Sequence, residues 1–394
     1  MIKELSQPEV RAFIEAHESD DPADLVLKFS DKTDLPLQLI AGQIRSRQKA
    51  KIKLPVLANT PNVIFPMGVS MEQCSSEATA LYKSKLLSGS SLTDLSGGFG
   101  IDSYYFSKIF GHINYVEPNS DLCELSRYNF NLLGCKNINI FNATAEQYLA
   151  EETTKSNCYF IDPSRRNESM ERVFKIQDCQ PDVLELTHEI VKRKTHFLVK
   201  LSPFIDIQET LHLISNVSEV HVVAAKNECK EVLFLLAPNY NASPIVSTVN
   251  LVGNRWNRFE FTYNEESEIP NFSLPQKYLY EPHAAIMKAG GFNSIANKYG
   301  VNKLHRNSHL YTSEILLNNF PGRQFLIRDI LAPGKKAIRK AIPSGKANIT
   351  VRNFPESVAQ IRKKTGLNDG GNNYLFYSTL HSGDLVAILC EKIN

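Results

Sequence analysis

The sequence predicts an α/β protein in which a twisted, mostly parallel sheet stands between a helical beginning and an α+β end. Three observations support this prediction. Residues 93–102 read Thr-Asp-Leu-Ser-Gly-Gly-Phe-Gly-Ile-Asp, which is a strand end and a glycine turn, and a helix-like run follows over 103–110. Further strand-like runs return at intervals up to residue 236. Helical spacing dominates residues 1–60, whereas short alternating runs dominate residues 245–394.

The segment around the glycine turn is predicted to be a βαβ unit. A second strand, residues 113–117, follows the helix and ends in Glu117, which lies 19 residues after Gly98. A glycine turn before a helix N-terminus lets a ligand approach bare backbone. An acidic residue at the end of the second strand is where a ribose hydroxyl pair is held. The dinucleotide fingerprint requires a third Gly or Ala where Ser103 stands, so an NAD-binding protein remains only an alternative.

Five more strand-like runs bring the predicted sheet to seven strands: 138–141, 158–162, 196–203, 220–224 and 232–236. The third strand leads to Thr144. The fourth ends in Asp162-Pro163-Ser164-Arg165-Arg166. Either arginine is suited to bind a phosphate or carboxylate bidentately, and pairing with acids of the fold is the equal alternative.

Length and composition describe an ordinary globular chain of two or three domains. The 394 residues are 42% hydrophobic and 22% charged, with a net charge of +2. No apolar stretch reaches the roughly 20 residues of a membrane span, and Met1-Ile2-Lys3-Glu4 does not resemble a signal peptide. Seven scattered cysteines include no C-x-x-C pair. We therefore expect no metal, no disulfide framework, no membrane partner and a cytoplasmic location.

Residues 1–64 are predicted to form a helical segment, with helices near 8–16, 24–29 and 37–51. The third helix ends in alternating basic residues, and one more follows it, which we interpret as a solvated face, with RNA contact as the alternative. These residues are Arg45, Arg47, Lys49 and Lys51, with Lys53 just beyond the helix. Residues 72–80 begin a helix just before the first strand, and we expect 73–79 to cover the ligand site. Residues 65–240 then form the main domain, and a turn-rich linker, 237–244, precedes a C-terminal module over 241–394.

The C-terminal module combines single strands at 324–330, 347–351, 374–378 and 384–390 with helices at 282–290 and 355–365, and residues 245–264 read as a hairpin. Residues 331–364 hold nine basic residues and a single acid, Glu356. Such a concentration in a nearly neutral chain predicts a site for a polyanion, and an idle basic surface is the alternative. The basic residues are Lys335, Lys336, Arg339, Lys340, Lys346, Arg352, Arg362, Lys363 and Lys364.

These motifs together resemble bacterial class I S-adenosylmethionine (SAM) methyltransferases that carry a C-terminal THUMP-like domain. The resemblance is carried by E-Q-C-S-S-E-A-T-A (72–80), D-L-S-G-G-F-G-I-D (94–102), F-I-D-P-S-R-R (160–166) and the tail around 331–390. It implies a seven-stranded Rossmann-like sheet that binds SAM. It also implies Asp94 near the methionine end, Gly98 and Gly100 beneath it, Glu117 on the ribose and Thr144 near the adenine. The other residues assigned to the cofactor site are Ser96, Gly97, Asp102 and Asp162.

Asp-Pro at a strand end resembles the acceptor motif of nucleic-acid methyltransferases, which implies catalytic roles for Asp162, the Pro163 carbonyl and Arg165. True THUMP domains bind RNA, so the resemblance implies an RNA substrate, tRNA or rRNA, and no DNA. The predicted activity is SAM-dependent methylation of an RNA base nitrogen. A protein or small-molecule methyltransferase and a non-catalytic RNA-binding protein are the alternatives.

Overall fold

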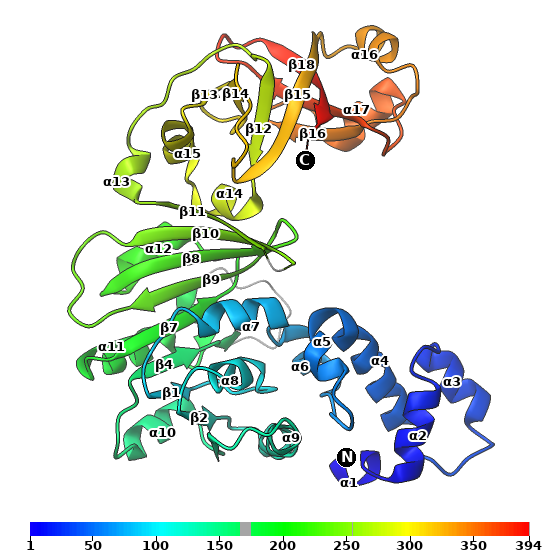
Figure 1. Cartoon of the computed structure of the whole chain (residues 1–394), viewed down its shortest axis with the longest axis vertical. Coiled ribbons are helices and arrows are strands. Elements are labelled where there is room, and N and C mark those ends of the chain that lie inside the picture. Colours follow the sequence, from blue (N-terminus) through cyan, green and yellow to red (C-terminus); the bar gives the residue numbers. More distant parts are fainter. Residues whose placement is uncertain (166–174, 254, 394) are drawn as a thin grey trace. The chain divides into compact units, whose positions relative to one another are not determined.

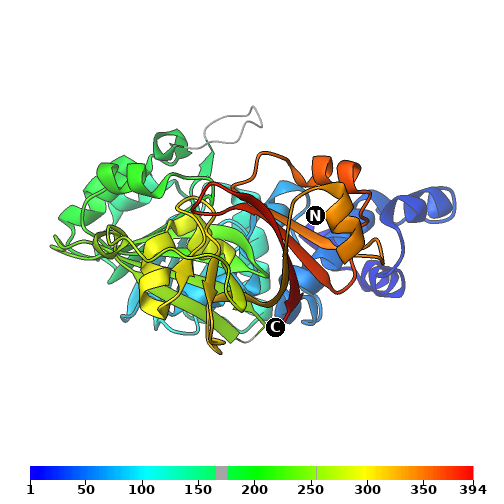
Figure 2. The ribbon, with the colours of Figure 1, turned by 90° about the horizontal axis from the view of Figure 1, so that it is seen from above.

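The computed structural model describes residues 1–165, 175–253 and 255–393 (Figure 1). The chain begins with helices that lie together in both views of the ribbon (Figures 1 and 2). Their expected positions are confirmed within a few residues. Asp21 caps the third helix through the amides of Ala23 and Asp24, and Pro22 occupies its first position. The helices are α1 (Ile2–Leu5), α2 (Pro8–Ala16), α3 (Pro22–Phe29), α4 (Leu37–Lys53) and α5 (Pro55–Ala58).

A nine-stranded sheet follows, with the order β11-β10-β8-β9-β7-β4-β1-β2-β3. Its central strands are parallel, and β1 lies between β2 and β4. The crossing of the chain from one side of β1 to the other creates the switch point at which ligands bind in open α/β sheets. The strands are β1 (Ser91–Asp94), β2 (His112–Val116), β3 (Ile138–Phe141), β4 (Cys158–Ile161), β7 (His196–Leu201), β8 (Val217–Ala225), β9 (Glu228–Leu236), β10 (Ile245–Val252) and β11 (Arg255–Phe261).

The α/β class is confirmed, but the expected count of seven strands is corrected to nine. The predicted hairpin exists as β10 and β11, which pair antiparallel. It was expected in the C-terminal module, yet β10 also pairs in parallel with β8 and so extends the large sheet. The physical reason is burial: six consecutive residues of β10 are buried, which is typical of a strand covered on both faces.

Two helices precede the first strand of this sheet, and others connect its strands. Most begin at an Asn, Asp, Ser or Thr whose side chain accepts hydrogen bonds from the first turn, as Asn119 does for α9. A two-stranded ladder of β5 (Ser164–Arg165) and β6 (Cys179–Gln180) stands apart, next to the short helix Ile176–Asp178. The helices are α6 (Val69–Gln73), α7 (Glu77–Ser84), α8 (Ile101–Phe106), α9 (Ser120–Leu132), α10 (Ala145–Glu151), α11 (Val183–Lys192) and α12 (Ile207–Leu213).

The C-terminal part is an α+β module, as expected, around a seven-stranded sheet of order β13-β14-β12-β15-β18-β17-β16. The four predicted strands and the two predicted helices, α14 and α17, are present, while β12 to β14, α13, α15 and α16 were not predicted. The strands are β12 (Tyr278–Pro282), β13 (Asn302–Lys303), β14 (Tyr311–Ser313), β15 (Gly322–Leu331), β16 (Asn348–Arg352), β17 (Asn373–Thr379) and β18 (Leu385–Lys392). The helices are α13 (Tyr263–Glu266), α14 (Ala284–Ala289), α15 (Phe292–Tyr299), α16 (Lys335–Ala341) and α17 (Val358–Thr365).

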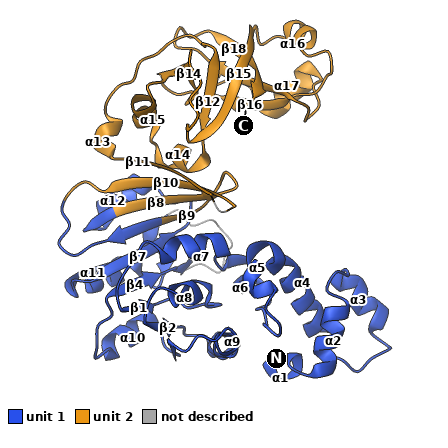
Figure 3. Cartoon of the chain, viewed as in Figure 1, with its two compact units in different colours: residues 1–218, 233–241 blue, residues 219–232, 242–394 orange. Residues whose placement is uncertain are grey.

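Residue contacts divide the chain into two compact units (Figure 3). The first contains residues 1–218 and 233–241, and the second contains residues 219–232 and 242–394. Every residue of the glycine-turn site belongs to the first unit. Among the described residues, no helix combines the length and apolar character that crossing a membrane requires.

Candidate active site

The first strand of the sheet places Asp94 at the carboxyl edge, where the residue is only 1% exposed. Its Oδ1 accepts the Ser96 amide at 3.1 Å, and its Oδ2 accepts the Ser103 hydroxyl at 2.6 Å. Burial raises the pKa of Asp94 to about 7, and the hydrogen bond from Ser103 opposes this shift. Ser103, which breaks the dinucleotide fingerprint, therefore serves as a donor to the buried acid.

The glycine turn is tightly packed on two of its glycines and open at the third. A Cβ at Gly97 would lie 2.3 Å from the Tyr115 ring, and a Cβ at Gly100, whose φ is +81°, would lie 2.5 Å from Phe130. Gly98 also has a positive φ, +54°, but a Cβ there would meet only the Ser96 carbonyl oxygen, at 3.7 Å. The backbone at Gly98 is thus the part of the turn that a ligand can approach.

Glu117 comes directly after β2 and reaches back to this turn. Its Oε2 accepts the Gly98 amide at 2.9 Å, and its Oε1 accepts the Asn119 amide at 2.9 Å. The residue is 9% exposed. Because each carboxylate oxygen has a second lone pair, Glu117 is still able to accept hydrogen bonds from two ligand hydroxyls.

Asp102, in the first turn of α8, anchors the segment that precedes the sheet. Its Oδ2 accepts the Ser75 hydroxyl at 2.7 Å, and its Oδ1 lies 3.1 Å from the ammonium of Lys83, which is fully buried. Lys83 also donates to Ser75 at 2.8 Å. The sequence drew attention to residues 72–80 but not to Lys83, which ties α7 to the glycine turn.

Thr144 caps α10 instead of standing free at the end of β3. Its hydroxyl accepts the Gln147 amide at 3.2 Å, and the Gln147 side chain accepts the Thr144 amide at 3.0 Å. The predicted contact of Thr144 with adenine stays a prediction.

The acceptor motif lies at the same sheet edge as Asp94. The Asp162 amide donates to the Ser96 hydroxyl at 2.6 Å, and this hydroxyl is also 3.4 Å from Asp94 Oδ1. Pro163 follows, half-buried. The backbone of Arg165 lies in β5, while its side chain and Arg166 lie outside the described residues. Sequence reasoning missed Lys200 of β7, which forms an ion pair with Asp162; a lysine inside an otherwise apolar strand was the available signal.

Four of the five basic residues near the end of α4 have partners within the protein, which counts against the alternative of RNA contact. Arg47 and Lys51 both pair with Glu18, at 2.9 and 3.0 Å, and Lys49 pairs with Glu72 at 2.6 Å. Lys53 donates to the Met71 and Glu72 carbonyl oxygens, which end α6. Arg45 is exposed.

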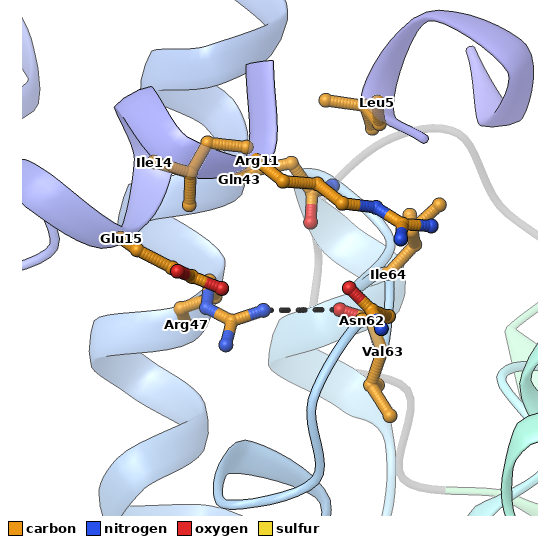
Figure 4. Close-up of a pocket in the computed structure, with 9 residues that line it drawn as sticks. All are labelled: Leu5, Arg11, Ile14, Glu15, Gln43, Arg47, Asn62, Val63 and Ile64. Carbon is orange, nitrogen blue, oxygen red and sulfur yellow. Dashed lines mark hydrogen bonds between the residues drawn. The ribbon is translucent and has the colours of Figure 1, made fainter. Parts of the chain in front are cut away.

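A pocket in the first unit lies among these helices and not at the glycine turn (Figure 4). Val63 and Ile64, which line one wall, begin a strap that comprises residues 63–66. The Gln43 side chain accepts the Phe65 amide at 3.0 Å and donates to the Phe65 carbonyl oxygen at 2.5 Å. Asn129 of α9 does the same for Ile64, at 3.1 and 2.8 Å. The Phe65 ring lies 5.9 Å from the ring of Phe99, so the strap connects the helical segment to the glycine turn.

The nine basic residues of the C-terminal module divide into two groups. Three hold partners in the fold: Arg352 pairs with buried Glu281 at 2.8 Å, Lys364 pairs with Glu356 at 2.8 Å, and Arg362 pairs with Asp369. The other six are exposed and form no ion pair with any described residue. These are Lys335, Lys336, Arg339 and Lys340 of α16, Lys346, and Lys363 of α17.

Comparison with known proteins places this geometry in context. Residues 278–321 match the model of a ferredoxin-like domain family, and residues 322–392 match that of a THUMP domain-like family. A crystal structure of a candidate methyltransferase from Porphyromonas gingivalis W83 is similar along the whole chain, with 32% identity, a TM-score of 0.87 and 98% coverage of both chains. No curated protein gives a significant match.

Other solved structures match a smaller part of the chain. A candidate methyltransferase from Escherichia coli is 15% identical with a TM-score of 0.31, covering 41% of this chain and 85% of its own. An rRNA methylase from Streptococcus thermophilus is 12% identical with a TM-score of 0.31, covering 41% and 95%. The full-length similarity to the Porphyromonas protein is decisive: the chain belongs to the class I SAM-dependent methyltransferases with a C-terminal THUMP-like domain.

Proposed function

We propose that this enzyme methylates a base nitrogen of RNA, tRNA or rRNA, with SAM as the methyl donor, in the cytoplasm. The observation that carries the proposal is the convergence of Asp94, the glycine turn, Glu117 and Asp162 on one sheet edge of a methyltransferase. Seven free cysteines are in keeping with a reducing compartment. We also propose the domain division 1–64, 65–240 and 241–394.

The residues at the sheet edge fit a SAM-type cofactor. When bound, SAM supplies an electrophilic methyl group on a sulfonium. The open backbone at Gly98 admits the ligand, and Glu117 retains lone pairs for the ribose hydroxyls. Asp94 places a buried acid where the methionine end is expected. Asp102 holds the covering segment in place through Ser75.

Asp162 and the Pro163 carbonyl are proposed to hold the acceptor nitrogen in line with the methyl group. The Ser96 hydroxyl fixes the Asp162 backbone and reaches Asp94 as well, so the two ends of the site share one support. Most of the catalytic effect is then positioning, which supplies up to roughly 7–11 kcal/mol in well-oriented reactions.

The six exposed cations of the C-terminal module are proposed to bind the RNA backbone. Four of them lie on α16, and α16 contacts α17, which carries Lys363. Cations without internal partners are available to neutralise phosphates, whereas Arg352, Arg362 and Lys364 stabilise the module itself.

The activity test is transfer of labelled methyl from SAM to RNA extracted from a strain that lacks this protein. We expect label in a discrete RNA band with wild type. With Asp162→Ala we expect a loss of transfer by orders of magnitude but retained SAM binding in calorimetry. Label found only in protein would contradict the proposal, and near-normal transfer by the variant would contradict the role of Asp162.

The RNA-binding test compares two triple variants of the full chain by filter binding at several salt concentrations. Lys335→Gln/Lys336→Gln/Lys340→Gln removes cations without partners. The control, Lys49→Gln/Lys51→Gln/Lys230→Gln, removes cations that have acidic partners. Each phosphate contact contributes about 0.7 to the slope of log affinity against log salt. The first variant removes three cations, so we expect its slope to be smaller in magnitude by about 2. Equal slopes in both variants would place the RNA elsewhere.

A further inference from the structure

A group of aromatic and cationic side chains in the C-terminal module has no role in the glycine-turn site. We call it the histidine cluster, and it comprises Phe272, His305, Arg306 and His381. His305 and Arg306 follow β13, and His381 stands in the turn between β17 and β18. The side-chain nitrogen of Asn353, just after β16, lies 3.0 Å from the His305 ring. All of these residues belong to the second compact unit.

Hydrogen bonds fix the tautomer of His305. The backbone amide of Asn307 lies 3.0 Å from Nδ1, and because an amide N–H only donates, this ring nitrogen carries no proton. The Asn353 side chain donates to the same atom. The ring proton therefore resides on Nε2, which has no hydrogen-bond partner among the described residues. His305 thus offers an N–H donor that the fold does not use.

The charged groups that act on His305 are all of one sign. Burial, followed by the charges of His381, Arg306 and Lys303, lowers the pKa of His305, so its ring is neutral at pH 7. Arg306 is exposed and forms no ion pair with any residue that the structure describes. A guanidinium beside a neutral N–H donor is suited to bind the oxygens of an anion, and the anion relieves the repulsion among the cations.

The His381 ring provides an aromatic surface in the same cluster. It stacks on Phe272, with the ring centroids 4.6 Å apart and an interplanar angle of 15°. A backbone bridge to Lys303 of β13 holds the Phe272 segment against the module. His381 is exposed although Phe272 covers one face of its ring, so the opposite face is open to a third ring. Aromatic side chains of this kind are the surfaces on which unpaired bases stack.

We propose that the histidine cluster binds an unpaired nucleotide of the RNA. The base stacks on the open face of His381, and Arg306 and the Nε2–H of His305 bind the phosphate. This inference rests on the proposed RNA methylation and adds a single-stranded segment to its substrate. A double-stranded RNA hides its base faces inside the helix, so a stacking surface is useful only for an unpaired base.

The place of the cluster in the fold agrees with the proposed contact to the RNA backbone. Leu331 at the end of β15 pairs with Ala387 near the start of β18, so β15 ends at the edge of the sheet that also holds the His381 turn. Helix α16 begins just beyond this end of β15, at Lys335. An RNA bound by the exposed cations of α16 is thus able to extend an unpaired segment towards His381.

The first test measures binding of the full chain to three RNAs by fluorescence anisotropy. The probes are a blunt duplex and the same duplex with an unpaired uridine tail at the 5′ or the 3′ end. We expect wild type to bind a tailed RNA more tightly than the blunt one. His381→Ala should weaken binding of that tailed RNA by about 5- to 100-fold, the worth of one stacked base, without affecting the blunt duplex.

Two matched variants accompany this measurement. His381→Tyr keeps a ring on Phe272 and should retain most of the preference for the tailed RNA, which separates lost stacking from lost folding. His212→Ala removes an exposed histidine of α12 in the first unit and should behave like wild type.

The second test examines the phosphate contacts with the same probes at several salt concentrations. Arg306→Gln should reduce the magnitude of the salt slope for the tailed RNA by about 0.7 and leave the slope for the blunt duplex unchanged. His305→Leu removes the Nε2–H donor and should weaken binding of the tailed RNA by about 3- to 10-fold. His305→Gln presents an amide N–H near that position and should restore part of the affinity.

The outcomes separate this inference from the proposed function. Equal binding of tailed and blunt RNA by wild type, or a preference that survives His381→Ala, would overturn the nucleotide site while leaving RNA methylation intact. Loss of the preference in both His381→Ala and His381→Tyr would overturn the stacking role of the ring. Absence of binding to every probe, together with absence of methyl label from RNA, would overturn the proposed function and this inference together.

Discussion

Replacing Asp94 by Asn is expected to stabilise the ligand-free protein while weakening its binding of SAM. Asp94 is buried at the end of β1 and bonded to Ser96 and Ser103. Burial raises its pKa from 3.8 to about 7, so ionisation in the folded state is costly. Asn keeps the size of the side chain and removes the charge. The same charge is the feature that we expect the cationic cofactor to need.

The magnitude follows from linkage. The folded pKa is raised above the unfolded one, so the unfolded state loses its proton first as pH rises. The stability of wild type relative to Asp94→Asn should therefore fall between pH 4 and pH 7 and level off above pH 7. Within this range the free energy of unfolding of wild type should fall by about 1.4 kcal/mol per pH unit relative to Asp94→Asn. The total loss approaches about 4 kcal/mol.

The assay is urea unfolding of both proteins between pH 5 and pH 8.5, followed by circular dichroism. Asp31→Asn, at an exposed turn, serves as the matched control and should follow wild type at every pH. Calorimetry with SAM at pH 8 should show weaker binding for Asp94→Asn. A stability difference between wild type and Asp94→Asn that does not vary with pH would refute the reasoning, because Asp94 would then titrate like an exposed carboxylate.

Three further outcomes are expected. Gly100→Ala should lower the free energy of unfolding by about 2–4 kcal/mol through backbone strain and overpacking, whereas Gly134→Ala, with a similar φ of +69° but open space, should cost about 1–2 kcal/mol in the same urea titration. Gln43→Leu should cost about 2–4 kcal/mol in that titration, because it leaves the amide and carbonyl of Phe65 without partners. Burial lowers the pKa of His283 to about 4, below its unfolded value, so wild type should lose up to about 3 kcal/mol relative to His283→Gln as pH falls from 6.5 to 4; a flat difference would contradict this.

Local sequence signals predicted those parts of the site that lie close together along the chain. The glycine turn, Asp94 and the carboxylate of Glu117 belong to a single βαβ unit, so spacing along the chain and the resemblance of the Asp94 motif were enough to select them. Lys200 could not be found in this way. Its partner Asp162 lies 38 residues away, and only the pairing of β4 with β7 brings them together.

The same limit explains the strands. The alternating and apolar residues of 245–261 predict two strands. They do not tell which sheet these strands join, because that depends on the pairing of β10 with β8, which lies elsewhere in the chain. The ion pairs of basic residues also join distant parts of the chain. Arg352, for example, pairs with Glu281, which lies 71 residues earlier in the sequence. Sequence therefore predicted the charge of the C-terminal module, and the structure separates its internal ion pairs from its exposed cations.

The strap at residues 63–66 has a consequence for how this protein reaches its native state. Its Ile64 backbone is held by the amide of Asn129, 65 residues further along the chain, while Phe65 is held by Gln43, which precedes it. During synthesis Gln43 is able to bond to Phe65 early, because both residues belong to the first part of the chain. The bonds between Asn129 and Ile64 can form only after α9 has been synthesised. The strap, and with it the contact of Phe65 with Phe99 of the glycine turn, is thus held from both sides only after α9 has folded, and a fragment beginning at residue 65 would lack Gln43 altogether.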